Sequence, residues 1–214
     1  IPLKFLLWCW VIQLNHEELQ RIFSEIEKII ASNPDSIVVI DEAYVDFGAK
    51  SAVSLIDKYD NLLVTQTFSK SRSLAGARLG FGVANEKIIA DLMRLKYSTN
   101  PYNVNRMTAA AGHAAILDNG YYMDNCKRII ETREYTQNAL RELGFYTTDS
   151  KANFIFAKHE SISGIDSYTL LRESGILVRH FTDEKIKDYN RITIGSEEEM
   201  AVFVDTMKKI VKGA

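Results

Sequence analysis

The sequence predicts an α/β fold, in which a mostly parallel sheet with helices is followed by a smaller α+β unit. Short β-branched or aliphatic runs alternate with segments whose apolar residues recur at helical spacing, a pattern typical of parallel strands joined by helices. Near residues 118–122 this order gives way to one long helix and several short alternating strands. We therefore expect two domains, residues 1–120 and residues 121–214.

The first domain is expected to contain three helices and three buried strands. A helix is expected to begin at Asn15, with Glu18 as its capping partner, and to end at "NPDS". The apolar start "IPLKFLLWCWVIQL" is too short to span a bilayer as a helix, so we expect a buried strand or the irregular beginning of a fragment there. Continuously apolar runs predict strands buried on both faces, over residues 36–41, 61–67 and 77–84. Segments with helical periodicity predict helices over residues 86–97 and 104–117.

The second domain is expected to start with a long helix that ends at Gly144. Four strands are then expected in "FYTTDS", "NFIFAKH", "GILVRHF" and "YNRITIGS", with one helix over 165–174. The last helix should begin after Ser196, because Glu199 stands three residues further on, as in a capping box.

Composition and charge exclude several classes of function. The formal net charge of −2 and the pI of about 6.1 give no reason to expect nucleic acid or an anionic membrane as a partner. Cys9 and Cys126 are far apart and belong to no cluster with metal-ligand spacing, so we expect neither a disulfide framework nor a metal site. This cysteine usage fits the reducing cytoplasm.

Polar groups follow two of the expected strands at the point where each strand ends. Asp41 ends the run "SIVVID", Tyr44 follows three residues later, and Lys70 lies just beyond the run "NLLVTQT". Ligands of open α/β sheets bind at the carboxyl ends of strands, so these groups are expected to share one crevice. Each residue alone has an ordinary explanation as a surface lysine, a turn-capping aspartate or a core tyrosine. Because all three residues stand at the ends of expected strands, a shared ligand-binding site is the favoured interpretation.

The chemistry of this group suits pyridoxal 5′-phosphate (PLP). A lysine forms a Schiff base with that cofactor, and a carboxylate keeps its pyridine nitrogen protonated. The segment "QTFSKSRSLAGARLGFG" is a glycine-containing connection that also carries several hydroxyl side chains and Arg78. Hydroxyl and guanidinium groups of this kind bind phosphate.

Two segments carry a family resemblance. "DEAYVDF" and "TFSKSRSLAGARLGFG" resemble the signature segments of the fold-type I PLP-dependent aminotransferases, and among them the histidinol-phosphate aminotransferase family. The resemblance continues through "NFIF", "GILVR" and "NRITIGS", so it covers nearly everything after residue 15. It implies part of a large PLP-binding domain over 1–120 and the small C-terminal domain over 121–214.

The resemblance also implies residue roles. Lys70 would be the Schiff-base lysine that moves the proton during catalysis, Asp41 would pair with the pyridinium, and Tyr44 would donate to the ring oxygen. The cofactor phosphate would be bound by Thr67, Ser69 and Arg78. The substrate, including its phosphate or carboxylate, would be bound by Asn153, Arg179 and Arg191. From the residues alone, these last three can equally be two solvent-facing arginines and a turn asparagine.

The implied function is the PLP-dependent exchange of an amino group between histidinol phosphate and 2-oxoglutarate in histidine biosynthesis. The implied partners are a small-molecule amino donor and a phosphorylated substrate, in a cytoplasmic homodimer. The family carries a further N-terminal half, and its asparagine-bearing turn is replaced here by "KFLLWCWVIQL". We therefore expect a truncated chain with part of the active site. Two alternatives stay open: a related PLP-dependent phosphoamino-acid decarboxylase, and a fragment without catalytic activity.

Overall fold

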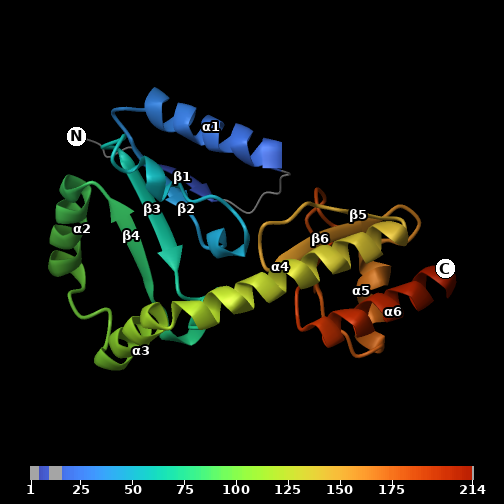
Figure 1. The fold of residues 1–214 in the computed structure, drawn as a ribbon. Helices are drawn as coiled ribbons and strands as arrows, with labels where there is room; N and C mark the ends of the chain where they lie inside the picture. Colours follow the sequence, from blue (N-terminus) through green and yellow to red (C-terminus); the bar gives the residue numbers. More distant parts are fainter. Residues whose placement is uncertain (1–4, 10–15, 214) are drawn as a thin grey trace. The chain divides into compact units, whose positions relative to one another are not determined.

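A computed structural model describes residues 5–9 and 16–213 of the chain. It divides into two compact units, Ile1–Asn125 and Cys126–Ala214, and each is described by itself (Figure 1). The expected helix cap at Asn15 lies outside the described residues. Among the described residues, no helix combines the length and the apolar character needed to cross a bilayer.

The first unit contains one four-stranded sheet and its helices. Its strands are β1 (Phe5–Cys9), β2 (Ile37–Asp41), β3 (Leu62–Thr67) and β4 (Gly80–Ala84), in the spatial order β1-β2-β3-β4. The first three are parallel, and β4 is antiparallel to β3. The helices are α1 (His16–Ser32), α2 (Glu86–Thr99), α3 (Arg106–Leu117) and the start of α4 (Asn119–Glu142). The mostly parallel sheet expected from the sequence is therefore present.

The core of this unit lies between α1 and one face of the sheet (Figure 1). Ile26 and Ile30 of α1 pack with Val38 and Ile40 of β2, and the cluster also includes Leu62 and Val64 of β3. Alternate strand residues point to opposite faces, and the intervening residues of β2 are only partly buried. The prediction that this strand is buried on both faces is therefore wrong for one of them.

The expected strand over 77–84 begins only at Gly80. Residues Ala75–Ala77 form a 3-10 turn, and Arg78 adopts a left-handed conformation with a φ of 52°. A residue with positive φ cannot continue an extended strand, so the chain turns before it pairs with β3. The predicted start was wrong because apolar content alone does not reveal this turn.

The second unit is an antiparallel sheet with three helices. Its sheet has the order β5-β6-β8-β7, formed by β5 (Phe145–Thr147), β6 (Phe154–His159), β8 (Asn190–Thr193) and β7 (Arg179–His180). Helices α4, α5 (Gly164–Glu173) and α6 (Glu197–Gly213) complete it. Ile155 and Ile192 of the sheet pack with Leu140, Leu171 and Phe203 of these helices.

Two helix boundaries of this unit follow the sequence signals. Gly144, just after α4, has a φ of 86°, which favours glycine over residues with a side chain. At the start of α6, Glu199 accepts the N–H of Ser196 at 2.8 Å, and Ser196 Oγ accepts the N–H of Glu199 at 3.2 Å. The predicted capping box is confirmed.

Candidate active site

Asp41 and Tyr44 lie at the carboxyl end of β2. Asp41 is the last residue of the strand, and its Oδ1 accepts the N–H of Ala43 at 3.1 Å. The N–H of Glu42 donates to Thr65 O of β3 at 2.8 Å, which keeps the two strand ends together. Tyr44 follows at the start of a short 3-10 turn, Val45–Phe47.

Lys70 lies beyond the carboxyl end of the adjacent parallel strand β3. Its side chain is exposed, and its Nζ lies 5.3 Å from the centroid of the Tyr44 ring. The structure therefore brings the predicted lysine and tyrosine together, from segments 26 positions apart in the sequence (70 minus 44). This follows from β2 and β3 being neighbours in the sheet.

The predicted hydroxyls lie at the end of β3 and in the loop that follows it. Thr67 Oγ1 lies 3.0 Å from Ser69 Oγ and accepts the N–H of Ser69 at 3.1 Å. Arg78 comes two residues before Gly80, which pairs with Thr67 across the β3–β4 ladder. The guanidinium of Arg78 is exposed, and its Nη1 donates to Ala75 O at 3.0 Å. Thr67 and Ser69 are thus in contact, while Arg78 is bound to its own turn.

Sequence reasoning missed the residues that hold the two loops in place. Glu42 is buried and accepts three hydrogen bonds, from Ser51 Oγ at 2.7 Å, Ala52 N at 2.6 Å and Gln66 Nε2 at 2.9 Å. The only sequence signal was a second carboxylate directly after Asp41, and its partners lie 9 to 24 positions away.

A second link joins the same two loops. Ser71, which follows Lys70, is buried, and its hydroxyl donates to Asp46 Oδ2 at 2.5 Å. The hydrogen bond connects the turn after Tyr44 to the loop that carries Lys70. Hydroxyl side chains are common in loops, so the sequence alone did not single out this serine.

The predicted substrate residues belong to the second unit. Arg179 of β7 and Arg191 of β8 are directly opposite each other in an antiparallel pair. Like charges in this position are destabilising unless an anion lies between them. Among the described residues, the buried Nε of Arg191 has no hydrogen-bond acceptor. The pair is therefore suited to bind a phosphate or carboxylate.

Asn153 precedes β6, in the same unit. Its backbone carbonyl accepts the N–H of Ile194, which follows β8, at 2.9 Å. The register pairs Phe154 with Thr193, so Asn153 enters the sheet next to the strand that carries Arg191. The structure thus places Asn153 directly before β6, which pairs with the strand that carries Arg191.

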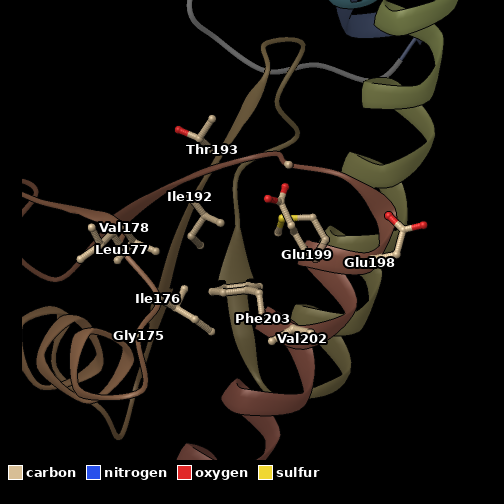
Figure 2. Close-up of a pocket in the computed structure, with 12 residues that line it drawn as sticks. Gly175, Ile176, Leu177, Val178, Ile192, Thr193, Glu198, Glu199, Val202 and Phe203 are labelled. Carbon is tan, nitrogen blue, oxygen red and sulfur yellow. The ribbon is translucent and has the colours of Figure 1, made fainter.

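A separate cavity of about 460 Å³ lies in the second unit (Figure 2). Its lining is mainly apolar and includes Ile176, Val178 and Phe203, with Glu198 and Glu199 from the start of α6 (Figure 2). Hydrogen bonds from its own backbone N–H and from the Ser196 hydroxyl lower the pKa of Glu198. None of the predicted site residues lines this cavity, and its carboxylates do not suit an anionic substrate.

Comparison with known proteins identifies the protein family to which the chain belongs. The model of the family "Aminotransferase class I and II" matches residues 22–207, so the chain belongs to this family. Over 189 residues it is 53% identical to histidinol-phosphate aminotransferase of Brachyspira hyodysenteriae, an alignment covering 88% of this chain and 53% of that protein. The chain thus spans about half the length of the curated relatives it matches.

Solved structures agree on the fold. The histidinol-phosphate aminotransferase of Clostridium acetobutylicum superimposes with a TM-score of 0.80 at 23% identity, covering 99% of this chain and 65% of that one. The enzyme of Sinorhizobium meliloti, solved in complex with pyridoxal-5′-phosphate, gives a TM-score of 0.77 at 20% identity, covering 99% and 58%. The predicted aminotransferase fold is confirmed.

Proposed function

We propose that this chain supplies the C-terminal part of the active site of a PLP-dependent histidinol-phosphate aminotransferase. The observation that carries the proposal is the meeting of Lys70 and Tyr44 beside Asp41, at the ends of two adjacent parallel strands. The 53% identity to a histidinol-phosphate aminotransferase supports the choice of substrate.

The donor set at these strand ends fits the cofactor. It contains one carboxylate, one phenol, one amine, and two hydroxyls 3.0 Å apart. Asp41 would hold the proton on the ring nitrogen, and Tyr44 would donate to the ring oxygen. The phosphate would be bound by Thr67, Ser69 and Arg78. When bound, PLP supplies a ring that withdraws electrons from the substrate's α-carbon.

Lys70 would have two tasks in this site. It would attach the cofactor through its Nζ, and it would then accept the proton released from the substrate's α-carbon. Its position over Tyr44 supports both roles, because the amine is exposed and lies beside a second polar group.

The opposed arginines of the second unit would bind the anionic ends of the substrate. Arg179 and Arg191 would contact its phosphate or carboxylate, since planar guanidinium groups bind such anions through paired hydrogen bonds. Asn153 would add a neutral contact from the position just before the adjacent strand β6.

Assays on these residues joined to the N-terminal half of the Brachyspira hyodysenteriae relative test this function. Amino transfer from histidinol phosphate to 2-oxoglutarate is expected, with Arg191→Gln raising KM about tenfold or more. Lys185→Gln, an exposed lysine outside the proposed site, is the control. Release of CO₂ from threonine phosphate without amino transfer would establish the decarboxylase alternative instead. The absence of both activities would establish a fragment without catalytic function.

We further propose a cytoplasmic homodimer. Several large apolar side chains of the segment that contains α2 and α3 are exposed, among them Tyr102 at 89%, Met107 at 85% and Leu117 at 73%. Apolar surface on this scale commonly marks a protein contact. The cysteine usage, two cysteines far apart in the sequence and in no cluster, fits a reducing compartment. A monomer mass in analytical ultracentrifugation of the 214-residue chain would contradict the dimer.

A further inference from the structure

Helix α4 buries an arginine inside the second unit. Arg133 is 1% exposed, and removal from water lowers the pKa of its guanidinium. Burying a cation is costly unless specific hydrogen bonds compensate, and an aliphatic residue would fill the same position without that cost. The contact made by Arg133 is therefore informative: its Nη1 donates to the backbone carbonyl of Ala152 at 2.7 Å.

Two further residues on the same face of α4 bind the same segment. Gln137 Nε2 donates to Thr148 O at 2.5 Å, and Arg141 Nε donates to Thr147 Oγ1 at 2.9 Å. Arg133, Gln137 and Arg141 are spaced four residues apart, so they project from one side of the helix. Arg141 also forms an ion pair with Asp149.

The segment they bind leads directly into Asn153. Thr147 ends β5 and residues 148–152 form no helix or strand, yet Thr147, Ser150 and Ala152 are all buried. Internal hydrogen bonds hold the segment as well: Ser150 N to Thr148 O at 3.0 Å, and Ala152 N to Ser150 Oγ at 3.0 Å. Its last residue, Ala152, is the one that Arg133 holds.

We propose that Arg133, Gln137 and Arg141 are positioning residues, which fix residues 147–152 against α4 and so set the place of Asn153 beside β8. The consequence for substrate binding rests on the proposed role of Asn153. The ordering of residues 147–152 does not depend on the role of Asn153, because it follows from contacts within the second unit.

Hydrogen exchange in the 214-residue chain tests the ordering. Arg133→Met removes a charge-assisted hydrogen bond, and we expect the amides of Thr148, Ser150 and Ala152 to exchange about 10- to 100-fold faster. Amides around Phe203 in α6 should be unchanged. Arg128→Met, an exposed arginine of α4, is the matched control, and Arg133→Lys should restore most of the protection because it keeps a cationic donor.

Two results would overturn the proposal. Unchanged exchange at residues 148–152 would mean that α4 does not order the segment, and equally faster exchange throughout the unit would mean that Arg133 is merely structural. If Arg133→Met does not fold, Gln137→Met decides the question by the same criteria.

Kinetics of these residues joined to the N-terminal half of the Brachyspira hyodysenteriae relative then separate this inference from the proposed function. Arg133→Met should raise KM for histidinol phosphate about tenfold, with a smaller change in kcat. Local exchange that increases while KM stays the same would contradict the positioning of Asn153. A lack of any turnover by the unsubstituted protein would contradict the proposed function and leave the exchange result to decide the ordering.

Discussion

Glu42 illustrates, at the scale of single residues, how the site is held together. Its carboxylate is buried between β2 and β3 and satisfies one backbone N–H and two side-chain donors. Because the donors come from separate segments, one carboxylate fixes the loop after β2 to the neighbouring strand. Asp41 and Tyr44, which flank it, gain their positions from this anchor.

Replacing this anchor should destabilise the first unit. Glu42→Ala leaves Ser51, Ala52 and Gln66 without their acceptor, and we expect a loss of about 2–4 kcal/mol in the free energy of unfolding. Urea denaturation measures it. The control is Glu25→Ala, an exposed residue paired with Lys28, which should cost at most about 0.5 kcal/mol. Equal losses for both variants would show that Glu42 is not an anchor.

Residues of the site differ in how well the sequence predicts them. Asp41, Tyr44 and Lys70 were predictable because they follow recognisable strands, and strand ends meet at one edge of a parallel sheet. Glu42, Ser71 and Arg133 were not, because their function depends on partners 9 to 25 positions away. Local spacing contains no information about such partners.

At the scale of secondary-structure elements, the β3–β4 pair depends on one glycine. A Cβ at Gly80 would lie 2.8 Å from the backbone carbonyl oxygen of Gln66, closer than a real contact allows. The backbone of β3 cannot yield without disturbing the ladder, so Gly80 permits the close pairing next to the Lys70 loop.

This glycine provides a test with an internal control. We expect Gly80→Ala to destabilise the chain by about 1–3 kcal/mol through this clash. Gly76→Ala should be neutral or stabilising by up to about 1 kcal/mol, because a Cβ there meets nothing within 4 Å. Thermal or urea unfolding of both variants distinguishes them. A neutral Gly80→Ala would mean that β4 tolerates displacement.

The stability that the start of α6 contributes should depend on pH. Hydrogen bonds from its own backbone N–H and from Ser196 lower the pKa of Glu198 below its ordinary value of 4.5. The stabilisation is therefore complete above about 4.5 and is lost as the pH falls through the lower folded value. Ser196→Ala should reduce this acid dependence in urea unfolding and cost about 1 kcal/mol at neutral pH. An unchanged pH profile would contradict the assigned cause.

Elements were predicted more reliably than their edges. Periodicity and caps located α2, α5 and α6 within about two residues, because helix signals are local. The predicted start of β4 was wrong because Arg78 is left-handed after a 3-10 turn, and apolar content does not reveal such a turn. Burial on both faces of β2 was overestimated, since apolar content does not reveal which face is covered.

At the scale of the whole molecule, the chain spans about half the length of its curated relatives. We therefore expect the 214 residues alone to bind PLP weakly and to transfer amino groups poorly. Each charge-assisted hydrogen bond expected from the N-terminal half of those relatives is worth about 1.5–3 kcal/mol, and about 1.4 kcal/mol is a factor of ten in affinity. A PLP titration measures this. Tight stoichiometric binding with ordinary turnover would show that these residues suffice.

The central claim is that Lys70 is the amine that attaches the cofactor, and one measurement tests it most directly. The chain is incubated with excess PLP, reduced with borohydride, digested, and analysed by mass spectrometry. The account predicts a phosphopyridoxyl group on Lys70, lost in Lys70→Arg and retained in the control Lys87→Arg. The reason is that Lys70 lies beside Tyr44 at the strand ends, while Lys87 is an exposed residue of α2. A phosphopyridoxyl group on Lys87 or another surface lysine, with Lys70 unmodified, would contradict it.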